Sequence, residues 1–223
     1  MRLILASASP RRAELLRTAG YSFDTVPVDV DERVRPGEAA EAYVRRLAIE
    51  KSAHAYGVMS GFSRTSTGPP EGGHSVTLEG GHSVILEEGG HYVILAADTA
   101  VVVDGDILGK PVDNGDARRM LRRLSGREHE VMTGISLRAG DLELGAVETT
   151  RVEFVRLSSD DVEWYVRSGE GRDKAGAYAI QGLASRFIPR IDGSYTNVVG
   201  LPVARVAGLL DELGCRPSTP SRA

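Results

Sequence analysis

The chain is poor in cysteine, in long apolar segments and in excess positive charge, and each shortage removes a class of protein. Its single cysteine, Cys215, stands near the C-terminus, so one chain can form neither a disulfide framework nor a cysteine zinc site. No apolar stretch reaches the length that spans a membrane. There are 27 basic against 31 acidic residues, a net charge of −4, so the basic excess needed for non-specific nucleic-acid binding is missing. We therefore expect neither a nucleic acid nor a membrane as partner.

What the sequence does contain is typical of a globular protein. Its 223 residues are 41% hydrophobic and 26% charged, which is enough to bury a core and too hydrophobic for wholesale disorder. The apolar residues 3–6 are too few for a signal peptide, and Pro10, Arg11 and Arg12 follow closely. The sequence predicts a cytoplasmic protein.

Strand and helix patterns alternate along the chain. A helix is predicted at 10–18, because Ser9 is a favourable N-cap and Pro10 suits the first helical position. Further helices are predicted at 38–56, 116–124, 160–168 and 202–213, and strands at 3–6, 92–103, 130–138 and 142–157. The alternation predicts an α/β fold. The long alternating segment around 149–155 predicts a mixed rather than a purely parallel sheet.

A segment of eight residues occurs three times just before the core strand at 92–103. Residues 71–78 (EGGHSVTL) and 79–86 (EGGHSVIL) are nearly identical, and a third copy (EGGHYVIL) occupies 88–95. So few short copies do not make a solenoid; either a duplication expands a loop at about 57–90, or the histidines form a metal-binding tract. Only the third copy is fused to Ala97 and Asp98, so we expect it to enter the sheet. The first two copies are expected to form an exposed hairpin or to stay disordered.

Two arginines stand in the first turn of the first helix, where the helix dipole disfavours cations. Arg11 and Arg12 are either solvated or part of a phosphate site. In such a site they would converge with the hydroxyls of Ser7 and Ser9 and with free helix amides. The chain has no GxxxxGK[ST] motif, so the site is not a P-loop.

Two further charges interrupt apolar patterns. Lys51 lies on the apolar stripe of the second helix, four residues after Leu47, where a lysine either snorkels to the edge of the core or binds phosphate inside a cleft. Asp98 interrupts the apolar strand at 92–103. Because an unpaired buried carboxylate is costly, Asp98 should meet a metal, a lysine or a substrate, or act as a base. The alternative is a structural ion pair or hydrogen bond in the core.

Two loops are further candidates. Asp104-Gly105 predicts a hairpin turn that returns the chain toward Lys110, near Asp98. The segment 173–182 combines small residues, which permit close approach of a ligand, with the amide of Gln181, which can both donate to and accept from a base edge.

An acidic cluster precedes the second helix. Asp29, Asp31 and Glu32 lie in a predicted loop. They are either a solvated cluster or a source of oxygen ligands for a hard cation such as Mg²⁺.

Taken together, these residues resemble the Maf family of nucleoside triphosphate pyrophosphatases. The resemblance covers nearly the whole chain except about 57–90 and the tail after Gly214. Its motifs are Ser7-Ala8-Ser9-Pro10-Arg11-Arg12, Glu32, Glu50-Lys51, Ala97-Asp98-Thr99, Gly109-Lys110-Pro111, Leu124-Ser125-Gly126, Asp173-Lys174-Ala175-Gly176-Ala177-Tyr178, Ile180-Gln181-Gly182, Gly193-Ser194-Tyr195 and Gly200-Leu201-Pro202.

The resemblance implies an elongated α/β fold with a mixed twisted sheet, helices on both sides and a deep cleft between two lobes, similar to the inosine triphosphate pyrophosphatases. It implies a single domain at 1–214, with the repeat-bearing insertion at about 57–90 and a flexible tail at 215–223. It also implies a homodimer.

The reaction implied is hydrolysis of a nucleoside triphosphate between the α and β phosphates, with Mg²⁺ or Mn²⁺. Asp98 would be the general base and, with Glu32, would hold the metal. Substrate-binding residues would be Ser7, Ser9, Arg11, Arg12, Lys51, Thr99, Lys110 and Gln181.

Within the family, Thr99 and Ile180-Gln181-Gly182 resemble the branch that acts on dTTP and UTP. Arg12, Thr99 and Gln181 are therefore the predicted specificity residues. Alternatives are a 7-methyl-GTP pyrophosphatase, a nucleotide-binding regulator of septation without turnover, or a metal-sequestering protein using the histidine tract.

Overall fold

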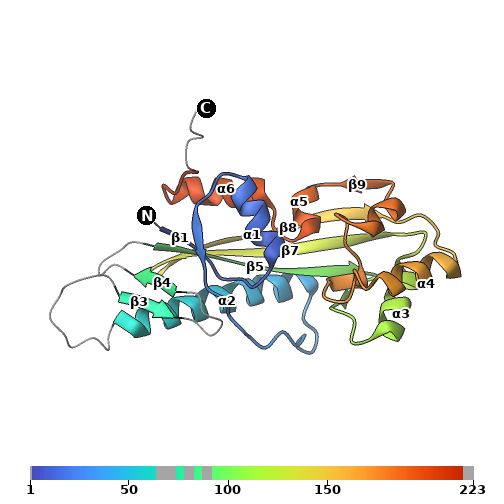
Figure 1. The fold of residues 1–223 in the computed structure, drawn as a ribbon, viewed down its shortest axis with the longest axis horizontal. Coiled ribbons are helices and arrows are strands. Elements are labelled where there is room, and N and C mark those ends of the chain that lie inside the picture. Colours follow the sequence, from blue (N-terminus) through green and yellow to red (C-terminus); the bar gives the residue numbers. More distant parts are fainter. Residues whose placement is uncertain (1, 64–73, 78–82, 87–91, 218–223) are drawn as a thin grey trace.

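The computed structural model describes residues 2–63, 74–77, 83–86 and 92–217, which form an elongated molecule around one large sheet (Figure 1). The sheet has seven strands, in the order β2-β1-β5-β7-β8-β9 with β6 paired to β5. β1 runs parallel to β2 and β5, and all other pairs are antiparallel, so the predicted mixed sheet is confirmed. The strands are β1 (Arg2–Leu5), β2 (Phe23–Thr25), β5 (Tyr92–Val103), β6 (Asp106–Leu108), β7 (Glu128–Ala139), β8 (Leu142–Glu153) and β9 (Arg190–Asp192).

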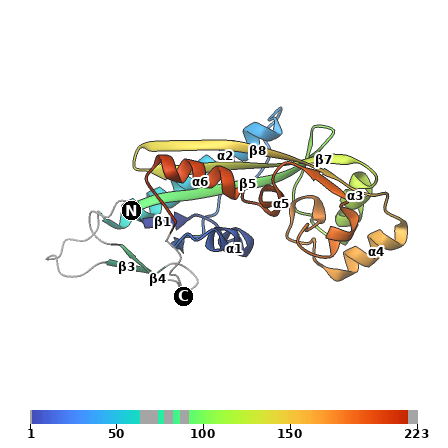
Figure 2. The same cartoon turned by 90° about the horizontal axis from the view of Figure 1, so that it is seen from above.

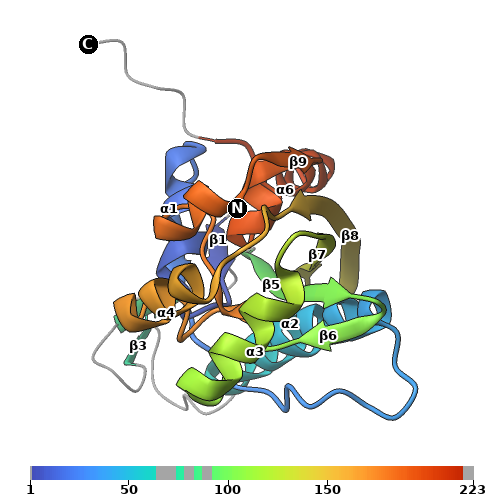
Figure 3. The same cartoon turned by 90° about the vertical axis from the view of Figure 1, so that its right-hand side faces the viewer.

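Helices cover both faces of this sheet. Figure 3 shows α2 on one face and α1 and α6 on the other, and Figure 2 shows α3 and α4 gathered at one end of the long strands. No helix among the described residues is both long and apolar enough to cross a membrane. The helices are α1 (Pro10–Thr18), α2 (Ala40–Ser63), α3 (Asn114–Leu124), α4 (Ser159–Ser168), α5 (Tyr195–Val199) and α6 (Val203–Glu212), with short 3-10 helices η1 (Ala175–Ala177) and η2 (Leu183–Phe187).

The observed boundaries differ from the predicted ones for local reasons. α3 begins at Asn114 rather than Asp116, because the Asp113 side chain accepts a hydrogen bond from the Asp116 backbone N–H at 2.7 Å and caps the helix. α2 continues to Ser63, into the range assigned to the insertion. β8 ends at Glu153, after which the Phe154 N–H bonds to the Arg127 carbonyl outside the ladder.

β5 is the central strand, and its alternating side chains divide the molecule into two layers. Its even-numbered residues pack against α2, whereas its odd-numbered residues pack against α1 and α6 and, farther along, against α3 and α4. Asp98 thus faces the layer of α2, and Thr99 faces the opposite layer.

One edge of β5 is left open at its middle. On the side away from β7, β1 pairs with β5 up to Leu95 and β6 pairs from Val101 onward. Residues 96–100 therefore have no ladder partner on that edge among the described strands. The hairpin turn that carries the chain from β5 to β6 is the predicted Asp104-Gly105, with positive φ at both residues.

The three repeats take different places. Residues 92–95 of the third copy lie in β5, as predicted. Residues of the first and second copies form β3 (His74–Thr77) and β4 (Ser83–Leu86), an antiparallel pair separate from the main sheet. The rest of the predicted insertion, 64–73, 78–82 and 87–91, lies outside the described residues, as does 218–223 of the predicted tail. Cys215, at the start of that tail, is buried against the α1 and α6 layer.

A buried histidine sits in the core beneath α3 and α4. His129 is 3% exposed, and its Nε2 lies 2.8 Å from the Tyr178 hydroxyl. The ring also packs edge-on against Phe154, with centroids 5.2 Å apart. Burial lowers the pKa of His129 to about 4.

We predict that Gly134→Ala destabilises the fold. A Cβ on Gly134, in β7, would lie 2.2 Å from the Val44 carbonyl oxygen of α2, so helix and sheet must separate at a cost of about 1–3 kcal/mol. Gly57→Ala is the matched control, because a Cβ there meets nothing within 4 Å and alanine favours an exposed helix by roughly 0.5–1 kcal/mol. Urea unfolding measures both; equal stabilities would contradict the tight α2–β7 contact.

We predict that His129 makes the fold less stable at acidic pH. Below about pH 6.5 the unfolded chain binds a proton at this residue, whereas the folded chain does so only near pH 4. Stability is therefore lost as the pH falls through this window, by about 2 kcal/mol between pH 7 and pH 5. Urea unfolding of wild type and His129→Gln at both pH values tests this; parallel losses in the two proteins would refute it.

Candidate active site

A cleft of about 510 Å³ opens beside the unpaired part of β5. Side chains from both layers of the molecule line it, and they include every residue that the sequence predicts for the site: Ser7, Ser9, Arg11, Arg12, Glu32, Lys51, Asp98, Thr99, Lys110 and Gln181. A second hollow, of about 620 Å³, is lined by residues 111–115 and Arg172 and contains none of these ten. The chemistry therefore concentrates in the first cleft.

The floor of the cleft is a buried charge cluster. Lys51 of α2 is 7% exposed, as is Asp98 of β5. The Lys51 ammonium donates to Asp98 Oδ1 at 2.6 Å and to Glu32 Oε1 at 2.7 Å. Lys51 lies on the side of α2 that packs against the even-numbered residues of β5. Its ammonium group is therefore buried and paired, and the side chain does not extend to the edge of the core.

The two carboxylates of this cluster have opposite pKa shifts. Burial raises the pKa of Asp98, although Lys51 and Arg12 oppose the rise. Burial also acts to raise the pKa of the more exposed Glu32, but the Lys51 hydrogen bond and the charges of Lys51 and Lys110 outweigh it and lower that pKa. The surroundings of the two carboxylates thus shift the pKa of Asp98 upward and that of Glu32 downward.

Glu32 sits on a loop that α2 holds in place. The Tyr43 hydroxyl donates to the Glu32 backbone carbonyl at 2.9 Å, and Arg46 donates to the Arg33 carbonyl at 3.2 Å. Arg46 also forms a bidentate pair with Glu38 at 2.6 and 2.8 Å. The loop has no regular secondary structure, so these contacts fix the position of the Glu32 carboxylate. Tyr43 and Arg46 were not predicted from the sequence.

Lys110 reaches the cluster from the strand-turn segment after β6. Its Nζ lies 3.5 Å from Glu32 Oε2. The expected return of the chain toward the cluster is correct, with Glu32 rather than Asp98 as the ion-pair partner among the described residues.

The opposite wall is built around Arg12. Its guanidinium donates to the Gly200 carbonyl at 2.8 Å, to the Thr99 hydroxyl at 3.1 Å and to Ser7 Oγ at 3.4 Å. Thr99 in turn hydrogen-bonds to Thr133 at 2.9 Å. Arg12 is thereby fixed at the start of α1, on the other face of β5 from Lys51.

The start of α1 differs from the sequence expectation in one respect. Ser9 occupies the N-cap position, but within the described residues its side chain makes no capping hydrogen bond. Its backbone N–H donates instead to Ser7 Oγ at 3.2 Å. The Ser9 side chain thus does not cap the first turn of α1, and Ser9 and Arg11 both line the cleft.

A scaffold on α4 holds the loop that carries Gln181. Tyr165 donates to the Glu170 carboxylate at 2.7 Å and accepts from the Ala179 N–H at 3.0 Å. Glu170 also accepts from the Leu183 N–H at 2.9 Å. A Cβ on Gly182 would lie 1.8 Å from the Glu170 carboxylate, so a larger residue there would displace this carboxylate.

The charge of the cleft suits a metal-bound polyanion. Five cationic side chains line it against four carboxylates. No group of three or more His, Cys, Asp and Glu in the described chain stands ready to hold a metal by itself. Glu32 and Asp98 nevertheless converge on one ammonium group, and two carboxylates completed by substrate phosphates fit the ligation that Mg²⁺ prefers. The cations are Arg11, Arg12, Lys51, Lys110 and Lys174, and the carboxylates are Asp29, Glu32, Asp98 and Asp173.

Known proteins match this chain over almost its full length. A protein named dTTP/UTP pyrophosphatase from Anaeromyxobacter dehalogenans is 46% identical over 217 residues, covering 96% of this chain and 94% of that protein. One of the same name from Chromobacterium violaceum is 46% identical over 213 residues, covering 96% and 95%. Among solved structures, the Staphylococcus aureus Ham1 protein aligns with a TM-score of 0.41 and 14% identity over 69% of this chain and 72% of its own.

The family comparison agrees with the resemblance seen in the sequence. The model of the family described as Maf-like protein matches residues 2–213, which span both walls of the cleft and the strand that carries Asp98. The chain therefore belongs to the Maf-like protein family.

Proposed function

We propose that this protein hydrolyses dTTP and UTP between the α and β phosphates, giving the monophosphate and pyrophosphate, and so removes these nucleotides from the cytoplasmic pool. The observation that carries the proposal is Asp98, a buried carboxylate of raised pKa on the floor of a cleft lined by cations. Relatives 41–46% identical over nearly the whole chain bear the name dTTP/UTP pyrophosphatase.

In the proposed reaction the cations bind the triphosphate, and Asp98 accepts a proton from water. The water oxygen bonds to the α phosphorus, the bond from this phosphorus to the α–β bridging oxygen breaks, and pyrophosphate leaves with the electron pair. A base of raised pKa accepts a proton more readily, provided it remains ionised at the working pH. Arg11, Arg12, Lys51 and Lys110 stabilise the charge that develops on the leaving pyrophosphate.

A divalent cation, Mg²⁺ or Mn²⁺, is part of the proposal. Glu32 and Asp98 would hold it together with substrate phosphates. When bound, it would neutralise phosphate charge and polarise the anhydride.

Nucleotide choice is proposed to rest on Arg12, Thr99 and Gln181. The Gln181 side chain is exposed at the cleft on the turn held by Tyr165 and Glu170, where its amide can pair with the donor and acceptor edge of uracil or thymine. The homodimer implied by the resemblance stays a prediction.

Asp98→Asn is expected to lower kcat by about 10²- to 10⁴-fold, because the amide cannot accept the proton. Chromatography of products from dTTP, UTP, CTP, GTP and 7-methyl-GTP measures it, with dTTP and UTP giving monophosphate and pyrophosphate in the wild type. Asp192→Asn is the matched control, since its carboxylate pairs with Arg151 in an exposed ion pair outside the cleft.

Three results would contradict this proposal. Undiminished turnover by a folded Asp98→Asn would remove Asp98 as the base. Nucleotide binding without turnover by the wild type would favour a septation regulator. Preferential hydrolysis of 7-methyl-GTP would place the chain in the other branch.

Chelation by EDTA is expected to abolish turnover, and Mg²⁺ or Mn²⁺ to restore it. Glu32→Gln should raise the metal concentration needed for half-maximal activity, because one of two carboxylate ligands is lost. Asp31→Asn is the control on the same loop, since its carboxylate is bonded to Arg33 at 2.6–3.0 Å. Titration of activity with each metal measures these effects; equal metal dependence in Glu32→Gln and Asp31→Asn would exclude Glu32 as a ligand.

A further inference from the structure

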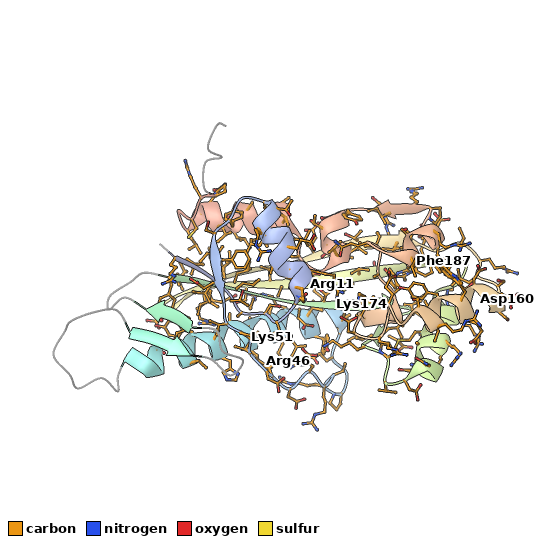
Figure 4. The ribbon with its side chains drawn as sticks, viewed as in Figure 1. Arg11, Arg46, Lys51, Asp160, Lys174 and Phe187 are labelled. Atoms are coloured by element: carbon orange, nitrogen blue, oxygen red, sulfur yellow. The ribbon has the colours of Figure 1, made fainter. Side chains whose placement is uncertain are left out.

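An anion of the protein itself already occupies part of the cationic wall. Asp173 offers one carboxylate oxygen to the Lys174 ammonium and the other to Arg11 Nη1, 3.9 Å away. Arg11 and Lys174, labelled in Figure 4, both line the cleft and share Asp173 as a partner. Arg11 belongs to α1, whereas Lys174 precedes η1, so Asp173 connects two segments far apart in the sequence.

The partners of this bridge differ in exposure. The Asp173 side chain is 72% exposed, against 30% for Arg11 and 15% for Lys174. Asp173 can therefore turn into water at little cost, whereas Lys174 stays within the cleft it lines. The Lys174 hydrogen bond also lowers the pKa of Asp173, which keeps the carboxylate charged at neutral pH.

The backbone around Lys174 is held firmly. The Lys174 carbonyl accepts from the Ala177 N–H at 3.0 Å, and the Gly176 N–H donates to the Gly109 carbonyl at 3.0 Å. Gly176 has a φ of +68°, and a Cβ there would lie 2.9 Å from the Val101 side chain of β5. Because the loop is fixed to the sheet, an anion that replaces Asp173 meets Lys174 in its present place.

We infer that Lys174 binds a phosphate group of the substrate and that Asp173 is an internal counter-anion which this phosphate displaces. The inference rests on the proposed function and extends it to two residues beyond the predicted site. Asp173 neutralises the two cations in the free protein and competes with every polyanion that enters. It thereby lowers the affinity for the nucleotide and for the pyrophosphate product, and it assists release of the latter.

The test is calorimetric binding of inorganic pyrophosphate in the presence of Mg²⁺, measured alongside steady-state turnover of dTTP. Asp173→Asn should bind pyrophosphate about 2- to 10-fold more tightly and show a lower KM, because the competing charge is gone. Lys174→Met should bind it roughly tenfold more weakly and show a higher KM, with Lys174→Arg restoring binding. In the double variant, Asp173→Asn should lose most of its effect.

Asp104→Asn is the matched control. Asp104 also bridges two cations, Arg123 at 3.8 Å and Arg127, but on the surface away from the cleft. The Asp104→Asn substitution removes one negative charge, as Asp173→Asn does, and should leave pyrophosphate binding unchanged. An equal gain in Asp104→Asn and Asp173→Asn would reduce the effect to net charge and overturn the inference.

The remaining outcomes are equally decisive. Unchanged pyrophosphate binding by a folded Lys174→Met would exclude Lys174 as a ligand, and unchanged or weaker binding by Asp173→Asn would exclude the counter-anion. These failures differ from failure of the proposed function, in which the wild type itself neither turns over dTTP nor binds pyrophosphate. Thermal unfolding verifies that each variant is folded.

Discussion

The organisation of this protein depends on one buried ion pair, between Lys51 and Asp98. Asp98 lies in the middle of an apolar strand, where an unpaired carboxylate would cost several kcal/mol or become protonated. The Lys51 ammonium, 2.6 Å away, keeps it compatible with the fold. The same ammonium also holds Glu32 at 2.7 Å, so a helix, a strand and a loop meet at one nitrogen atom. The protein's own hydrogen bonds thus hold Lys51, Glu32 and Asp98 together.

The gap along β5 explains why this pair lies in a cleft. β1 and β6 share one edge of β5 and leave residues 96–100 between them. Strand alternation then sends Asp98 to the side of α2 and Thr99 to the side of Arg12. The Lys51–Glu32–Asp98 cluster and the side chains around Arg12 are thereby separated by the thickness of one strand, and both line the same cleft. Asp173 connects Arg11 of α1 with Lys174 of the loop before η1.

Much of the fold could be predicted from the sequence, because its helices, strands and turns follow from local residue patterns. Periodicity and turn residues gave the central strand at 92–103 and the first helix at 10–18 correctly. The fusion of the third repeat to Asp98 correctly identified the copy that enters the sheet. Ser9 stands at the N-cap of the first helix, as predicted, but its side chain makes no capping hydrogen bond among the described residues. A single residue type does not reveal which of several hydrogen bonds it makes.

The sequence by itself determined which groups are anomalous: an inward lysine, an acid within a strand and arginines at a helix start. These anomalies are local, since each violates a burial or dipole rule that neighbouring residues define. Only the tertiary structure decided their partners. Lys51 meets Glu32 across 19 residues of sequence and Asp98 across 47, and such contacts depend on how helix, sheet and loop pack together. The roles of Arg46 and Glu170 in supporting the loops also depended on the tertiary structure. Both residues bond backbone groups, which every residue possesses, so no residue type in the sequence marks their partners.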